Sequence, residues 1–452
     1  MFRKNFNQFL ISFLAGKKKF SIIILVSGFT LFFLSLIIIP KVIYKYYEFT
    51  KRFRTLEHQV SSYGKYIVSN IESYQKTRKM KLQLSGIDEN IKFNWHELDI
   101  PWNKEEYETT KAITLWGDNL VVGLSSKVKG KADIYMYDEK KWSKLNDNKN
   151  LSSVDWKKLN YVQVLCAHNE KLYAGINNTV LVYDKEGIWK EVKNVDEKYP
   201  WKDQLAYSMI SHNDYLYVGI YGSTSIYRLE NLEWKNISLG LDKFPGTGIY
   251  EMLSHTDGNL YASTVSKNKN SAIFKLNTNT INWEHIGGNG INGSWINSGF
   301  NYGFSMSSHK DFLFVTLNRA PLAVGNFSSI WAYDGKEWFV IGSENVPVKW
   351  GQMNTFNSSI SYKDMFFIGA GGHPAGNVSV WILNNNQWTL IGGFGVNNSW
   401  GPNFPHTLAK SFRHTASEYP YRFIVWNNSL ITGFGDNYGA ATLWQLNVTK
   451  NN

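Results

Sequence analysis

A tryptophan repeat constrains the fold of this chain more than any other feature of its sequence. Seven Trp residues each have an aliphatic residue three positions later, and they recur at intervals of 45 to 55 residues. The longest match between copies joins "IGGNGINGSW" (residues 286–295) to "IGGFGVNNSW" (residues 391–400). Repetition at this period indicates similar structural units placed side by side, because a catalytic motif is normally written once. The seven positions are Trp95, Trp142, Trp189, Trp234, Trp283, Trp338 and Trp388.

Each period also contains three further runs that are typical of short β-strands. In the clearest copy they read "YSMISH", "YLYVGI" and "SIYRL", with the turn formers Asn213 and Asp214 between the first two. The runs are rich in β-branched and aromatic residues, which favour strands. Seven copies of a four-stranded unit predict an all-β fold over residues 93–452, a seven-bladed β-propeller with four strands in each blade.

The ends of the repeat predict how the ring closes. The last unit has no Trp-bearing fourth strand before Asn452, whereas the strand "FNWHEL" around Trp95 precedes the first unit. We expect this N-terminal strand to pair with the strand that ends near Leu446 and so complete the last blade. Closure in this way leaves no unpaired strand edge.

The order of residues within each unit resembles kelch-type propellers. A glycine ends the second strand, an aromatic residue marks the third and a Trp marks the fourth, over about residues 93 to 448. One glycine mostly replaces the kelch pair, and Ser263 and Thr316 take its place in two units. The resemblance implies the fold and says little about a partner. Some kelch-like propellers are copper oxidases, but the lone Cys166 matches no Cys-Tyr redox centre, and we expect no metal and no cofactor.

The positive charge of the chain is confined to its N-terminal part. Residues 1–92 hold 16 Lys and Arg and 5 Asp and Glu, which is the entire net charge of +11, and the remainder holds 32 of each sign. A propeller without net positive charge offers no field to a phosphate backbone. We therefore expect no nucleic-acid partner.

A long apolar run predicts a membrane anchor. Residues 20–39 are uncharged and mostly apolar, about the ~20 residues that a helix needs to cross a bilayer. We expect a basic tail (1–19), a single-pass, uncleaved transmembrane helix (20–39) in the lipid bilayer, and a basic helical stalk (40–92) before the propeller. Basic residues flank the run on both sides, but the cluster Lys17 to Lys19 favours an extracytoplasmic propeller.

Long connections predict which face of the propeller is functional. The loops between second and third strands are long and rich in Gly and Asn, and they share a face with the crossovers between units. A second Trp lies 12 residues after the repeat Trp in several crossovers, where it either packs neighbouring blades or offers a platform to a ligand. The candidate ligand-binding residues on this face are Trp295, Trp350, Trp400, Asn292, Asn397, Arg319, His373 and Asp436.

Four histidines occupy one repeated position, just before the first hairpin turn of their units. A ring arrangement places them too far apart to share one ion, so we expect structural hydrogen bonds. They are His168, His212, His255 and His309.

The sequence contains no paired carboxylates, nucleophile elbow or phosphate loop. The leading hypothesis is therefore a membrane-anchored, non-catalytic recognition propeller that binds a glycan or protein partner through its loop-rich face. Two alternatives stay open: an extracytoplasmic enzyme acting on a polysaccharide, and a scaffold subunit of a membrane assembly.

Overall fold

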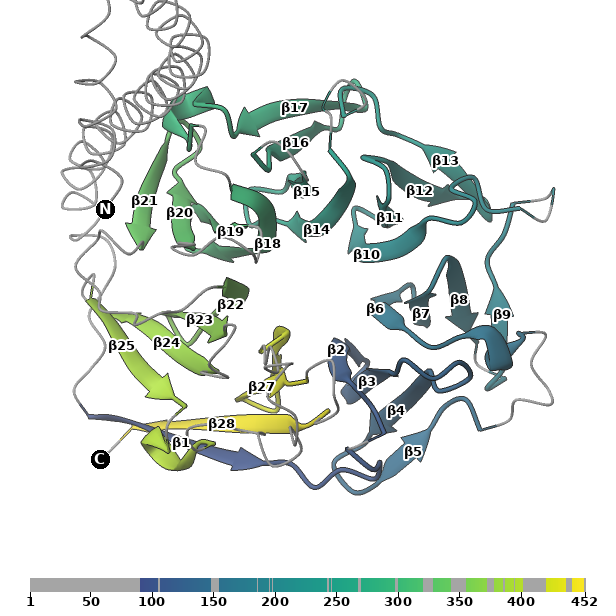
Figure 1. Ribbon diagram of the computed structural model, residues 1–452, viewed down its shortest axis with the longest axis horizontal. Helices are drawn as coiled ribbons and strands as arrows, with labels where there is room; N and C mark the ends of the chain where they lie inside the picture. The colour runs from purple at the N-terminus through teal and green to yellow at the C-terminus, as the bar shows by residue number, and fades with distance from the viewer. Residues whose placement is uncertain are drawn as a thin grey trace, which may run out of the picture. The chain divides into compact units, whose positions relative to one another are not determined.

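The computed structural model in Figure 1 describes most of the C-terminal four fifths of the chain. The described residues are 90–450 without 105, 148–153, 185, 195, 197, 242–243, 245, 267–269, 297–299, 320–327, 343–354, 372–377, 385–386, 394, 401–419 and 436–440. The predicted tail, the predicted transmembrane helix and nearly all of the predicted stalk lie outside these residues. In the part that is described, no helix is long and apolar enough to span a membrane.

The described residues form antiparallel β-sheet with three 3-10 turns, η1 (Trp156–Lys158), η2 (Ile291–Gly293) and η3 (Val396–Asn398). Three four-stranded sheets follow the chain in simple up-and-down order. The first contains β2 (Thr109–Trp116), β3 (Asn119–Ser125), β4 (Asp133–Tyr137) and β5 (Trp142–Lys144). The second contains β6 (Val162–His168), β7 (Lys171–Ile176), β8 (Thr179–Tyr183) and β9 (Trp189–Glu191). The third contains β22 (Thr355–Tyr362), β23 (Met365–Gly371), β24 (Ser379–Asn384) and β25 (Gln387–Gly392).

Twelve further strands form three similar groups of four. One residue pair joins each group to the next, so that the three groups count as one sheet. The pairs are Tyr221 with Gly248 and Val265 with Tyr302. The first group contains β10 (Leu205–His212), β11 (Tyr215–Tyr221), β12 (Ile226–Glu230) and β13 (Glu233–Asn236). The second contains β14 (Gly248–Ser254), β15 (Leu260–Val265), β16 (Ile273–Asn277) and β17 (Asn282–Gly287). The third contains β18 (Phe300–His309), β19 (Phe312–Arg319), β20 (Ser329–Tyr333) and β21 (Trp338–Gly342). All-β structure built from four-stranded groups is consistent with the predicted propeller.

The predicted pairing of the N-terminal strand is confirmed. β1 (Ile91–Glu97) pairs antiparallel with β28 (Leu443–Lys450), in the sheet that also holds β26 (Arg422–Trp426) and β27 (Ser429–Gly433). Trp95 lies opposite Leu446, and its indole N–H donates to the Ile391 carbonyl of the neighbouring sheet at 2.9 Å. Segments from opposite ends of the sequence therefore complete one sheet (Figure 1).

The tryptophan repeat is explained by a hydrogen bond between neighbouring sheets. Five of the repeat Trp side chains, those from Trp189 to Trp388, are nearly fully buried. In each, the indole N–H donates to a backbone carbonyl of the preceding unit. The acceptor is the aliphatic residue that follows the preceding repeat Trp by three positions. Pairing an indole with a carbonyl satisfies two polar groups inside an apolar contact. The bonds run from Trp189 to Leu145, Trp234 to Val192, Trp283 to Ile237, Trp338 to Ile286 and Trp388 to Ile341, at 2.7 to 3.2 Å.

Candidate functional site

The first strands of all the groups meet at the centre of the domain. Each contacts the next, and β26 contacts β2. Together they line a cavity of about 350 Å³. Ligand sites in proteins have volumes of roughly 300–1,000 Å³, so this cavity is large enough for one small molecule or one unit of a polymer. The lining strands are β2, β6, β10, β14, β18, β22 and β26.

Breaks in strand pairing direct side chains toward this cavity. In six of the seven strands, the pairing with the second strand shifts register at the same place. This place is five residues before the last residue that precedes the hairpin turn. A β-bulge re-aims the side chain of its extra residue, and such bulges are frequent beside functional sites. The cavity-lining residues at these breaks are Lys111, Gln163, Tyr207, Tyr250 and Asn357.

Lys111 of β2 crosses to a cluster of tyrosines on β10 and β14. Its ammonium nitrogen lies 3.5 Å from the centre of the Tyr207 ring and 5.6 Å from that of Tyr250. The two tyrosine rings are 5.0 Å apart. Burial and, to a lesser extent, the nearby charge of Arg422 lower the pKa of Lys111 to about 7, while the charge of Glu251 opposes them. A cation over aromatic rings in a partly closed space is a recognised binding arrangement.

Glu251 of β14 is the carboxylate among the described lining residues. It accepts a hydrogen bond from the backbone N–H of Met306 at 2.6 Å and another from the Ser305 side chain. Burial raises the pKa of Glu251 to about 7, although the Arg422 charge and these hydrogen bonds oppose the rise. A carboxyl group in this range can exchange its proton near neutral pH.

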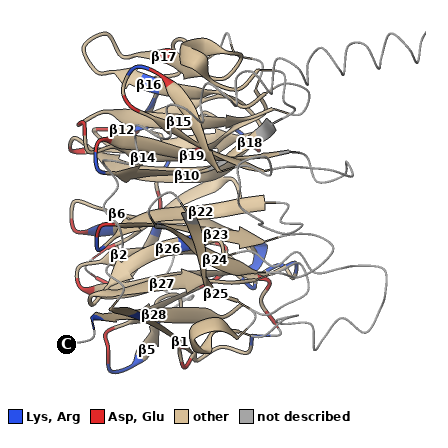
Figure 2. Ribbon diagram, turned by 90° about the vertical axis from the view of Figure 1, so that its left-hand side faces the viewer, with Lys and Arg blue, Asp and Glu red and all other residues tan. Residues whose placement is uncertain are grey.

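Arg422 of β26 is the second cation of the cavity lining. Among the described residues, no hydrogen bond or ion pair engages its guanidinium. Figure 2 shows charged residues at many of the turns along one side of the sheets. Among the seven first strands, the Lys, Arg, Asp and Glu residues are Lys111, Glu251 and Arg422, and all three line the cavity.

Hydroxyl and amide groups cover the wall between β18 and β22. The hydroxyls of Ser305 and Ser307 lie 3.1 and 2.9 Å from that of Ser359. Asn357 lines the same cavity, and its buried side-chain oxygen has no hydrogen-bond partner among the described residues. A buried acceptor without a donor costs free energy, so this oxygen is available to a ligand or a water molecule.

Two of the predicted aromatic platforms, Trp295 and Trp400, lie inside the protein. Trp295 and Trp400 are 2% and 3% exposed, and each indole donates to a backbone carbonyl, at 3.0 and 2.7 Å. Trp295 packs edge-on against Trp338, with ring centres 5.4 Å apart, and Trp400 packs in the same way against Trp95 at 5.3 Å. This burial favours the packing interpretation that the sequence left open.

The repeated phrase forms the same loop in both places. Asn292 and Asn397 have positive φ values of 53° and 54° inside η2 and η3. Each side-chain amide donates at 3.0 Å to the carbonyl of the aliphatic residue at the start of its phrase, Ile286 or Ile391. Asn tolerates this left-handed conformation better than most residues, so the duplication preserves loop geometry.

The remaining predicted site residues are not assembled by the described structure. Arg319 ends β19. Trp350, His373 and Asp436 lie outside the described residues. Their predicted contact with a ligand stays a prediction.

The repeated histidines form hydrogen bonds within the fold. Three of them bond through Nδ1 to a serine hydroxyl on the next first strand, and His255 bonds to Asp257 in its own turn. No group of three or more potential metal ligands occurs in the described residues. The three pairs are His168 with Ser211, His212 with Ser254 and His309 with Ser361, at 2.7 to 2.9 Å.

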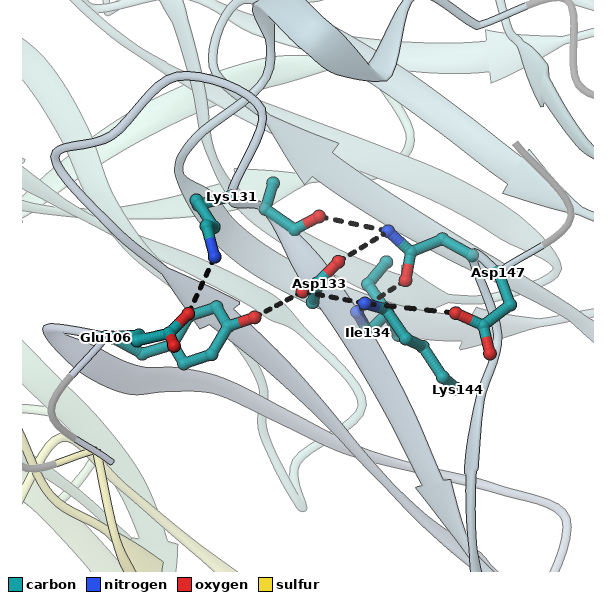
Figure 3. A network of polar contacts seen from close by, with 9 residues as sticks. Glu106, Lys131, Asp133, Ile134, Lys144 and Asp147 are labelled. Carbon is teal, nitrogen blue, oxygen red and sulfur yellow. Dashed lines mark hydrogen bonds and ion pairs between the residues drawn. The ribbon is translucent and has the colours of Figure 1, made fainter. Parts of the chain in front are cut away.

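A separate charged network on β4 and β5 is shown in Figure 3. Asp133 is 3% exposed, accepts hydrogen bonds from Tyr107 and Asn146, and lies 3.0 Å from the Lys144 ammonium. Burial alone would raise the pKa of Asp133, but these contacts outweigh it and lower the pKa. Both oxygens are engaged, so the network fits a structural role rather than a ligand site.

The central residues were missed by the motif search because no local motif marks them. A signal does exist in the aligned repeats. Charged letters interrupt first strands that otherwise lack Lys, Arg, Asp and Glu, as in "TTKAITLW", "GIYEMLS" and "RFIVW". Aligning the copies on the hairpin turn would have shown that these charges fall on two adjacent positions, with Glu251 and Arg422 at one and Lys111 one residue earlier.

No family model matches this sequence, and no curated protein matches it either. Solved structures do share its fold. Two structures of the extracellular domain of BT4673 from B. thetaiotaomicron, a proposed hybrid two-component or one-component system, are 10% and 11% identical. They cover 77% and 78% of this chain, with TM-scores of 0.50 and 0.52. This chain spans only 39% and 40% of their length.

A third solved structure, of a protein proposed to be a gluconolactonase, is 10% identical. It covers 82% of this chain and 96% of its own length, with a TM-score of 0.37. At these identities the comparisons speak to architecture and not to activity. Together with the four-stranded antiparallel sheets, the two BT4673 structures support a β-propeller-like fold for this chain.

Proposed function

We propose that this protein is a non-catalytic recognition protein whose propeller binds a glycan through the central cavity. The observation that carries the proposal is the convergence of Lys111, Glu251 and Arg422 from three different first strands on one cavity with a tyrosine cluster. A concave site that combines aromatic surface with a few convergent polar groups is typical of small-ligand sites. Sugars match it, because they present both hydroxyl groups and apolar ring faces.

The finer architecture is part of this proposal. The seven first strands support a seven-bladed ring of the kelch-like type, closed by β1. The apolar run at 20–39 supports a single-pass anchor, with the propeller on the extracytoplasmic side. The fold shared with solved extracellular domains fits that location. Protease digestion of intact cells carrying a C-terminal tag tests the orientation: a protected tag would contradict it.

A glycan array probed with the full-length chain in mild detergent tests the binding role. The variant Gln163→Trp places a large ring in the cavity, so we expect it to abolish glycan binding. Trp400→Phe removes a buried indole N–H and is expected to lower stability while affinity is retained. If Trp400→Phe abolished glycan binding and Gln163→Trp left it unchanged, the binding site would lie at the crossover loops and not in the cavity.

A polysaccharide-cleaving enzyme is the weaker alternative. Glycosidases normally use two carboxyl groups roughly 5 to 10 Å apart. The described lining of the cavity contains Glu251 as its carboxylate. The raised pKa of Glu251 suits a general acid, but a second carboxylate would have to come from residues beyond the described ones.

A further inference from the structure

The cavity contains two cations whose charges are not neutralised by contact with a protein carboxylate. Lys111 and Arg422 both line it, and no ion pair in the described structure joins either of them to Glu251. Glu251 is instead held by the Met306 backbone N–H at 2.6 Å and by the Ser305 side chain. The two cations therefore face the cavity with their mutual repulsion only partly offset.

Such an arrangement favours an anion. Desolvation and the nearby Arg422 both lower the pKa of Lys111, and Glu251 only partly opposes them, so the protein itself compensates this positive charge incompletely. A bound anion would supply the missing counter-charge in a partly desolvated space, where charge-assisted hydrogen bonds are strong. Arginine in particular matches planar carboxylates with its two parallel N–H groups.

The opposite wall points to hydroxyl groups on the same ligand. The Asn357 side-chain oxygen lacks a donor among the described residues, and Ser305, Ser307 and Ser359 line the same cavity. A ligand hydroxyl would donate to the Asn357 oxygen, and further hydroxyls could exchange hydrogen bonds with the serines. A peptide carboxylate on an apolar stem would leave the Asn357 oxygen without a donor. The tyrosine rings near Lys111 offer a surface for the ligand's apolar face.

We propose that the central cavity binds a sugar unit carrying an acidic group, with Arg422 and Lys111 at the acid and Asn357 with the neighbouring serines at the hydroxyls. This inference rests on the proposed glycan-binding function and specifies its ligand class. The cavity volume of about 350 Å³ fits a single such unit, free or at the end of a polymer.

Calorimetric titration of the full-length chain with matched sugars tests the proposal. Galacturonate is compared with galactose, and a sugar sulfate is included to separate carboxylate from sulfate as the acidic group. We expect either acidic sugar to bind at least about tenfold more tightly than the neutral one, because a hydrogen bond to a charged group contributes about that much affinity. A glutamate-containing peptide serves as the competing class of ligand.

Variants at three residues locate the effect. Arg422→Met and Lys111→Met are each expected to weaken acidic-sugar binding about 10- to 100-fold, and Arg422→Lys to restore part of it. Asn357→Asp keeps the side-chain shape but adds negative charge, so it should weaken the acidic sugar and spare the neutral one. Lys336→Met, on the exposed β20–β21 turn, is the matched control and should change nothing. Thermal unfolding of each variant confirms that it is folded.

Several outcomes would overturn the inference. Equal binding of galactose and galacturonate, unchanged in Arg422→Met, would leave glycan recognition intact but remove the acidic specificity. Binding of the acidic peptide in place of the sugars would assign the cavity to a protein ligand. If no sugar binds the wild-type chain, both this inference and the proposed glycan function fail.

Discussion

At the scale of single residues, the cavity combines groups that stability alone would disfavour. Lys111 is a half-buried lysine without a carboxylate in contact in the described structure, and desolvation is the main cause that lowers its pKa to about 7 from an ordinary value of 10.5. Charged groups in such positions reduce folding stability unless they are paired. Their presence on strands that otherwise carry small and apolar residues indicates a role other than support of the fold.

Lys111→Met is therefore expected to stabilise the domain while it impairs binding. In the wild type, the unfolded chain holds the Lys111 proton more tightly than the folded protein between pH 7 and 10.5, so this group's contribution to stability rises with pH across that window. The variant should gain about 1–3 kcal/mol at or below neutral pH, and the gain should shrink toward pH 10. Chemical denaturation at several pH values measures it. A loss of stability at neutral pH would show that the ammonium supports the fold.

At the scale of elements, the indole-to-carbonyl bond joins one sheet to the next. In Trp283 the N–H donates to Ile237 at 2.8 Å, and the ring is 2% exposed. Each unit provides a donor, its repeat Trp, and an acceptor, the aliphatic residue three positions later. Because nearly every unit makes this contact with its neighbour, the three-residue spacing recurs along the sequence. Trp142 departs from the rule: its indole donates to Asp99, one residue beyond Leu98.

Trp283→Phe tests the contribution of this contact. The variant leaves the Ile237 carbonyl without its donor and opens a small void, so we expect a loss of about 2–4 kcal/mol. Trp116 provides the matched control, since its indole also donates to a backbone carbonyl, that of Glu170, but at an exposed site. Trp116→Phe should cost less than about 1 kcal/mol. Urea unfolding compares them, and equal losses would refute a special role for the buried bond.

At the scale of the whole molecule, the pairing of β1 with β28 completes the last sheet. Every residue from Ile91 to Glu97 has a partner on β28. Trp95 belongs to the same apolar cluster as Trp400 and Leu446. Without β1, both the β28 edge and the apolar contact would be exposed, which promotes association between chains.

Deleting residues 1–97 is expected to destabilise the domain far more than deleting residues 1–89. The longer deletion removes β1 together with the buried Trp95, whose loss alone costs about 3–5 kcal/mol on the scale of large-to-small core substitutions. The shorter deletion leaves β1 in place and should change the midpoint of urea unfolding little. Similar midpoints for the two truncated proteins would show that β1 does not close the fold.

The sequence by itself determined the all-β architecture and the partner of the N-terminal strand. Both follow from patterns that recur along the chain, so that equivalent positions of different units can be compared within this one sequence. The packing of Trp295 and Trp400 and the hydrogen-bonded histidines also follow from repeated positions, since a residue needed in every unit serves the contact between units. The predicted anchor at 20–39 is equally a property of local hydropathy, and it stays a prediction.

Only the tertiary structure decided where the candidate site lies. Lys111, Glu251 and Arg422 are as much as 311 positions apart in the sequence, each occurs in a different unit, and no motif connects them. They become neighbours because the ring brings the first strand of every group to one centre, and because a bulge in β2 turns Lys111 inward. A site assembled from one residue per unit breaks the repeat rather than following it, so its members have no fixed spacing that a sequence pattern could show.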